Sequence, residues 1–133
     1  MLVVTLLLIT LQIALGEIVG AVATYPSTAV PITSLGGLIS ALLTAAGPIV
    51  LVHVANALLI LVAGIGSFAL ALRYHKRSVT ISAVLSLVSI VVAVLGGYIF
   101  AVSDFANGGG ILLMVNGALA AYALLFITLY YTK

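Results

Sequence analysis

Charged residues are almost missing from this sequence. Asp, Glu, Lys and Arg together make up 5% of its 133 residues, whereas apolar residues make up 65%. A soluble globular domain carries about 25% charged residues, so a soluble enzyme is excluded. Cysteine is absent, which excludes disulfides and thiolate metal sites. The formal net charge of +2 gives no support to nucleic-acid binding.

Long apolar runs take the place of charged surface. Four of them are long enough to cross a bilayer core of about 30 Å, which needs roughly 20 helical residues. They are approximately Leu2–Ala23, Pro48–Leu72, Val79–Val102 and Ile111–Tyr131. None alternates between apolar and polar residues as a barrel strand does. We therefore predict one all-α domain over residues 1–133, an integral membrane four-helix bundle.

The first connection also contains a helical pattern. The stretch "TSLGGLISALLTAAG" spaces its leucine and isoleucine residues as one face of a helix does. This pattern predicts a short surface helix near Ser34–Ala46, lying on the bundle or in the membrane interface. The triple glycine Gly108–Gly110 is expected to separate the third and fourth spans.

Basic residues lie on one side of the predicted bundle. Arg73, Lys76 and Arg77 share the short link between the second and third spans, and Lys133 ends the chain. Four spans place this link and both termini on the same side, which the positive-inside rule assigns to the cytoplasm. We therefore expect a multi-pass protein of the cell membrane with both termini in the cytoplasm.

The first span has an alternative interpretation as a cleaved signal peptide. The triplet Ala21-Val22-Ala23 is of the kind that signal peptidase cleaves. However, no Lys or Arg precedes the apolar run, and the run is longer than an ordinary signal core. We therefore predict that the first span is retained as a transmembrane helix.

Each span carries a polar side chain in the half away from the basic residues. They are Glu17, His53, Asn56, Tyr98 and Asn116. An ionisable residue inside a membrane is a candidate functional residue, because its cost in lipid favours an interior position. We therefore expect Glu17, Asn56 and Tyr98 to be buried polar residues, and His53 to face the bundle interior at a similar depth to Asn116.

These residues also have structural interpretations. Glu17 and His53 can form a hydrogen-bonded pair that only stabilises the bundle. Asn56 and Asn116 can join helices, a role worth about 1 kcal/mol or less. A single histidine is more often a packed core residue than a metal ligand.

Three stretches resemble a known family. They are "LQIALGEIVGAVAT", "HVANALLILVAGIGSFALALRYHKR" and "VAVLGGYIFAVSDFANGGGILLMVNGALAAYALL". They resemble one four-helix half of the haem A synthase family and related haem-binding membrane bundles, including the element Q-x-x-L-G-x-x-V in the first helix. The resemblance implies that His53 is a haem-iron ligand at the start of the second span, in a protein of the respiratory chain.

The sequence departs from that family at the positions that matter most. The resemblance places a second ligand histidine where this chain has Asn116, and a catalytic acid where it has Val50. The cysteine pair of the outer loop is missing, and the chain contains one bundle instead of two. Haem A synthesis by this chain alone is therefore not expected, and His53 and Asn116 remain as candidate cofactor-binding positions.

Three functions are consistent with these observations. The first is a small haem-binding or haem-handling protein of the respiratory chain. The second is a non-catalytic accessory subunit, without its own cofactor, that stabilises a larger oxidase or cytochrome complex. The third, a transporter or channel, would need more polar lining than Glu17 and His53 provide. In each case the expected partners are lipid and other integral membrane subunits, such as oxidase or cytochrome components.

Overall fold

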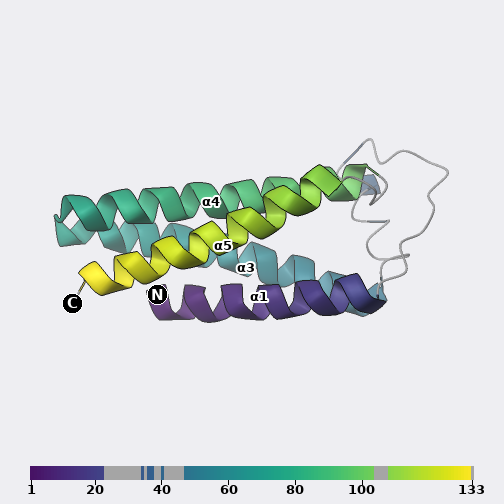
Figure 1. Cartoon of the computed structure of the whole chain (residues 1–133), viewed down its shortest axis with the longest axis horizontal. Coiled ribbons are helices and arrows are strands. Elements are labelled where there is room, and N and C mark those ends of the chain that lie inside the picture. The colour runs from purple at the N-terminus through teal and green to yellow at the C-terminus, as the bar shows by residue number, and fades with distance from the viewer. Residues whose placement is uncertain (23–33, 35, 38–39, 41–46, 104–107, 133) are drawn as a thin grey trace.

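The four predicted spans are four long α-helices in the computed structural model (Figure 1). The structure describes residues 1–22, 34, 36–37, 40, 47–103 and 108–132. The helices are α1 (Leu2–Val22), α3 (Gly47–Ala71), α4 (Arg77–Val102) and α5 (Gly108–Tyr131). All four are long and apolar enough to cross a membrane. The predicted all-α four-helix membrane bundle is confirmed.

Short backbone features decide where two of the helices begin and end. Gly47 has a φ of 72° and precedes Pro48, whose missing N–H is harmless in the first turn of α3. A 3₁₀ turn, η1 (Leu72–Tyr74), and His75 at a φ of 51° then reverse the chain into α4. Because this link is so short, α3 and α4 lie antiparallel.

The helices form a closed ring in the order α1, α3, α4, α5, with contacts between each neighbouring pair. We call the end with the α3–α4 link the basic end, and the end where α5 begins the loop end. Both termini lie toward the basic end, and α5 runs beside α4 at the loop end but approaches α1 near its own C-terminus (Figure 1). The pair α1–α3 therefore separates from the pair α4–α5 toward the loop end.

Glycine brings α4 and α5 into backbone contact. A Cβ atom at Gly96 would lie 2.5 Å from the backbone nitrogen of Met114, and one at Gly117 would lie 2.7 Å from that of Ala93. Small residues allow such close approach between membrane helices. The expectation that Gly108–Gly110 only separates two spans is wrong, because these residues begin α5. A Cβ at Gly110 would lie 2.8 Å from the backbone nitrogen of Phe100.

The half of the bundle nearer the basic end contains most of the buried side-chain contacts between the helices. Its apolar core consists of Leu6, Ile9, Ile60, Ile90, Ala121 and Leu125. Buried hydroxyl groups also join the helices there: Thr5 Oγ1 and Ser67 Oγ lie 3.0 Å apart, and Thr128 Oγ1 donates to Ser82 Oγ over 2.8 Å. A cavity of about 220 Å³ lies beside Ser67 and Thr128 at this end.

The predicted surface helix near Ser34–Ala46 lies mostly outside the described residues. Its described part agrees with a helix start, because Ser34 Oγ accepts a hydrogen bond of 3.1 Å from the backbone N–H of Gly37. A serine hydroxyl bonded to the N–H three residues later is a helix N-cap.

Candidate functional site

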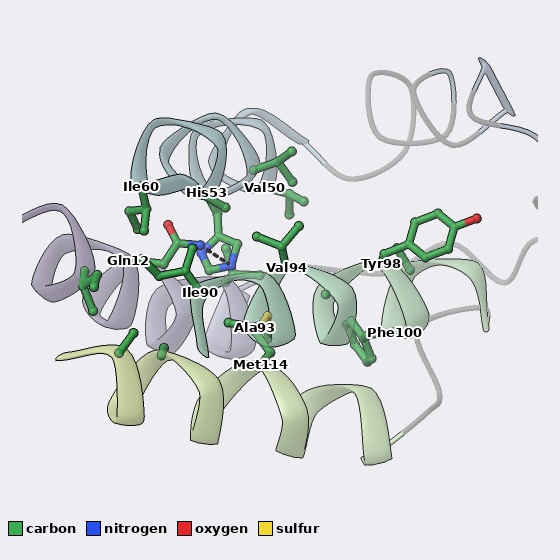
Figure 2. Close-up of a pocket in the computed structure, with 18 residues that line it drawn as sticks. Gln12, Val50, His53, Ile60, Ile90, Ala93, Val94, Tyr98, Phe100 and Met114 are labelled. Atoms are coloured by element: carbon green, nitrogen blue, oxygen red, sulfur yellow. Dashed lines mark hydrogen bonds between the residues drawn. The ribbon is translucent and has the colours of Figure 1, made fainter. Parts of the chain in front are cut away.

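A cavity of about 250 Å³ lies between the two helix pairs in the half nearer the loop end (Figure 2). All four helices contribute to its wall, which consists mainly of valine, isoleucine, alanine and glycine. Gln12, His53 and Tyr98 are the polar side chains among the residues that line it. The cavity follows from the separation of the helix pairs, since glycine holds α5 against α4 and away from α1.

A chain of hydrogen bonds runs along one side of this cavity and joins α1 to α3. Asn56 Nδ2 donates to the backbone oxygen of Leu8 over 3.0 Å and to Gln12 Oε1 over 2.8 Å. Gln12 Nε2 lies 3.0 Å from His53 Nε2. Asn56 is 5% exposed, so the chain is anchored in the interior of the bundle.

The backbone carbonyl at its start determines the direction of every bond in this chain. The oxygen of Leu8 only accepts, so the Asn56 atom that faces it is the amide nitrogen, and the same nitrogen faces Gln12 Oε1. The Gln12 amide nitrogen then donates to His53 Nε2. Neutral imidazole has one donor and one acceptor nitrogen. His53 is therefore neutral in this arrangement, and its proton is on Nδ1.

That proton has no acceptor among the residues that the structure describes. His53 Nδ1 is enclosed by protein and makes no hydrogen bond. A buried donor without a partner costs about 1–3 kcal/mol, and such a group in a folded protein needs an explanation. The chain therefore begins on a satisfied carbonyl and ends on an unsatisfied N–H at the wall of an apolar cavity.

Two residues expected inside the bundle lie on its outside. Glu17 is exposed. The hydrogen-bond partner of His53 is Gln12 and not Glu17. Successive helical residues are rotated by about 100°, so Glu17, five residues after Gln12, points roughly 140° away from it.

Asn116 is also exposed, and its Nδ2 donates to the backbone oxygen of Leu112 in its own helix over 2.8 Å. It is two residues after Met114, which lines the cavity, and two residues turn the helix by about 200°. Asn116 therefore does not face His53, although the resemblance matches it to the family's facing ligand position. Tyr98 lines the cavity but is 49% exposed, so it lies at the rim and is not a buried residue.

Two side chains of the site were missed at the level of sequence. Gln12 lies at the centre of α1, ten residues from each end, and a lone amide in the middle of an apolar span is the signal that could have found it. Met114 lines the cavity from α5. Because methionine is common in apolar cores, nothing in the sequence marks this residue in a comparable way.

A haem does not fit the residues in this arrangement. Iron is bound through a nitrogen lone pair, and the lone pair of His53 Nε2 accepts the Gln12 N–H while Nδ1 carries the proton. The other expected position, Asn116, faces away from the cavity. The volume of about 250 Å³ is below the roughly 300–1,000 Å³ of pockets that hold drug-sized ligands. Among the described residues, no group of three His, Cys, Asp or Glu side chains could hold another metal ion.

Comparisons of the chain with protein-family models, with curated proteins and with solved structures find no match.

Proposed function

We propose that this protein is a small integral membrane protein of the respiratory chain that binds an apolar ligand inside the bilayer. The binding site is the cavity beside Gln12 and His53. The observation that supports this function is the chain of hydrogen bonds that ends on the unpaired N–H of His53. The resemblance of the helices to the haem A synthase family supports the respiratory setting.

The other buried polar contacts of the bundle differ from this chain. Thr128 Oγ1 donates to Ser82 Oγ, and Thr5 Oγ1 and Ser67 Oγ bond to each other. Ser67 and Thr128 also line a cavity, of about 220 Å³, but each of their hydroxyl groups has a hydrogen-bond partner. A side chain that only joins helices needs no unsatisfied donor, whereas His53 keeps one. Its position at a cavity wall is therefore better explained by a ligand than by helix packing.

Filling the cavity tests this function. We expect Ala57→Phe, on the cavity wall, to remove most of any small molecule that copurifies in mild detergent, because a phenyl ring would occupy the ligand's space. The control is Ala55→Phe, the same change two residues away at an exposed position, which should leave binding unchanged. Bound molecules are measured by native mass spectrometry and solvent extraction, with an absorbance spectrum, reduced minus oxidised, to detect haem.

Equal ligand content in the two phenylalanine variants would contradict the proposed site. A Soret band that disappears in Ala57→Phe would instead identify the ligand as haem and would require Gln12 to release His53 Nε2.

A second candidate function, a non-catalytic subunit of a larger membrane complex, is supported by polar residues on the outside of the helices. Glu17 and Asn116 both lie on exposed positions of predicted membrane spans, where a polar group facing lipid is costly. A neighbouring subunit would cover them. The same native mass spectra separate the two candidates, since protein subunits copurifying with a ligand-free chain favour the second.

We further propose that the basic end faces the cytoplasm of a cell membrane. Arg73, Lys76 and Arg77 are exposed at this end, and Lys76 Nζ donates to the backbone oxygen of Tyr131 over 3.4 Å. The positive-inside rule assigns such a cluster to the cytoplasmic side. We expect Ser78→Cys to react with a membrane-impermeant thiol reagent only after the cells are opened. Labelling of Ser78→Cys in intact cells would show that the basic end faces the outside of the cell.

A further inference from the structure

We infer, on the basis of the proposed ligand site, that the bound molecule is an apolar, lipid-soluble compound with a carbonyl oxygen. Gln12 donates to this oxygen through the Nε2 proton that His53 does not use. A quinone head group and the ester carbonyl of a lipid share this chemistry.

The hydrogen bonds already made at the site indicate that the ligand is a hydrogen-bond acceptor. Each acceptor that it uses, the Leu8 oxygen, Gln12 Oε1 and His53 Nε2, already receives a hydrogen bond. An amide nitrogen has two protons, and Gln12 Nε2 uses one of them on His53. The second Gln12 proton and the Nδ1 proton of His53 have no acceptor among the described residues. Gln12, which lines the cavity, therefore has one donor left for a ligand.

The rest of the wall determines the body of the ligand. Apart from Gln12, His53 and Tyr98, its side chains are apolar, and they would leave a charged group unpaired at a large cost. A cavity of about 250 Å³ has room for a small ring or part of a chain. Figure 2 shows the Tyr98 hydroxyl pointing away from His53, toward the rim, where an apolar tail can pass into the surrounding lipid.

The Nδ1 proton of His53 does not reach the cavity. Nδ1 is enclosed by protein, although the imidazole itself lines the cavity. The two ring nitrogens point to nearly opposite sides of the ring, so one oxygen cannot accept from both Nδ1 and the Gln12 amide on Nε2. Gln12 therefore donates to the ligand with one proton and positions His53 with the other.

Two probes with the same ten-carbon chain test the need for a carbonyl: decylubiquinone, and decylbenzene, which has no acceptor. In detergent micelles, the full-length chain should bind decylubiquinone more tightly than decylbenzene. Gln12→Leu should weaken decylubiquinone binding about tenfold, the effect of one lost hydrogen bond of about 1.4 kcal/mol, and should not weaken decylbenzene binding. The exposed Asn116→Leu should change neither. Equal affinity for both probes, or equal loss of both in Gln12→Leu, would overturn the inference.

Nitrogen NMR tests the tautomer without removing any residue of the site. The chain has two histidines, and His75→Asn leaves His53 as the only one; asparagine tolerates the left-handed backbone of that position. With ¹⁵N-labelled histidine we expect a protonated Nδ1, an unprotonated Nε2, and a shift of the Nε2 signal on addition of decylubiquinone, because Nε2 accepts from the Gln12 amide that binds the ligand. A protonated Nε2, or an Nε2 signal that decylubiquinone leaves unchanged, would overturn the inference.

The same samples distinguish a quinone from a lipid as the carbonyl compound. They also distinguish failure of the carbonyl inference from failure of the proposed function. A quinone in the solvent extract identifies a quinone site, and a phospholipid at one molecule per chain identifies a lipid site. If Ala57→Phe still binds both probes, the proposed function itself fails. If Ala57→Phe loses both probes while Gln12→Leu makes no distinction between them, only the carbonyl inference fails.

Discussion

Replacing Asn56 by leucine should lower the free energy of unfolding by roughly 2–3 kcal/mol, the cost of leaving buried polar groups unpaired. Asn56 is 5% exposed and bonds to both Leu8 and Gln12. Leucine would leave the Leu8 oxygen without its side-chain donor, and Gln12 Oε1 without a partner in a low-dielectric interior. The loss is measured by SDS titration or thermal unfolding in detergent micelles.

Asn116→Leu is the matched control, because it makes the same substitution at an exposed position of a membrane span. Its effect should stay within about 0.5 kcal/mol, as is usual for surface changes. A similar loss of stability in both leucine variants would show that the buried chain adds nothing to the stability of the bundle.

Gly96→Ala should destabilise the protein by about 1–3 kcal/mol, as overpacking of a filled interior usually does. The new Cβ would lie 2.5 Å from the Met114 nitrogen and 2.7 Å from the Gly110 oxygen. Both atoms are backbone, so the two helices must move apart.

Gly97→Ala is the control at the next position of the same helix. Its Cβ would meet only the Met114 sulfur, at an ordinary 3.6 Å. This variant should be neutral or more stable by up to about 1 kcal/mol, because alanine has the higher helix propensity. Thermal unfolding of the two proteins side by side measures the difference. If Gly97→Ala is the more damaging change, the backbone contact between α4 and α5 is not what limits the packing.

The Gly96 contact also determines where a ligand site can exist. It holds α5 against α4 at the loop end, and α5 therefore lies away from α1 there (Figure 1). The Asn56 chain then joins α1 to α3 on the other side of the gap. Each helix pair has its own internal connection, and the cavity is the space that remains between the pairs.

The fold could be predicted from the sequence because the features that determine it are local. Four runs of apolar residues and few charges determine four membrane helices, since a backbone in lipid must satisfy its hydrogen bonds within each helix. The predicted boundaries lie within three residues of the observed ones, and the largest difference is at α5, which begins at Gly108 instead of Ile111. Glycine was interpreted there as a helix breaker, whereas close contact with α4 stabilises it inside the helix.

Only the tertiary structure decided which polar side chains point into the bundle and which point outward. His53 and Asn56 are three residues apart and share one side of α3, as their spacing predicts. Sequence does not state the rotation of one helix relative to another, because nearly all sides of these helices are equally apolar. The packing of α1 places Gln12 inside and Glu17 outside, and the glycine contact of α5 turns Met114 toward the cavity and Asn116 away from it. The composition therefore determined that this is a membrane bundle, and contacts between distant residues determined which side chains form its site.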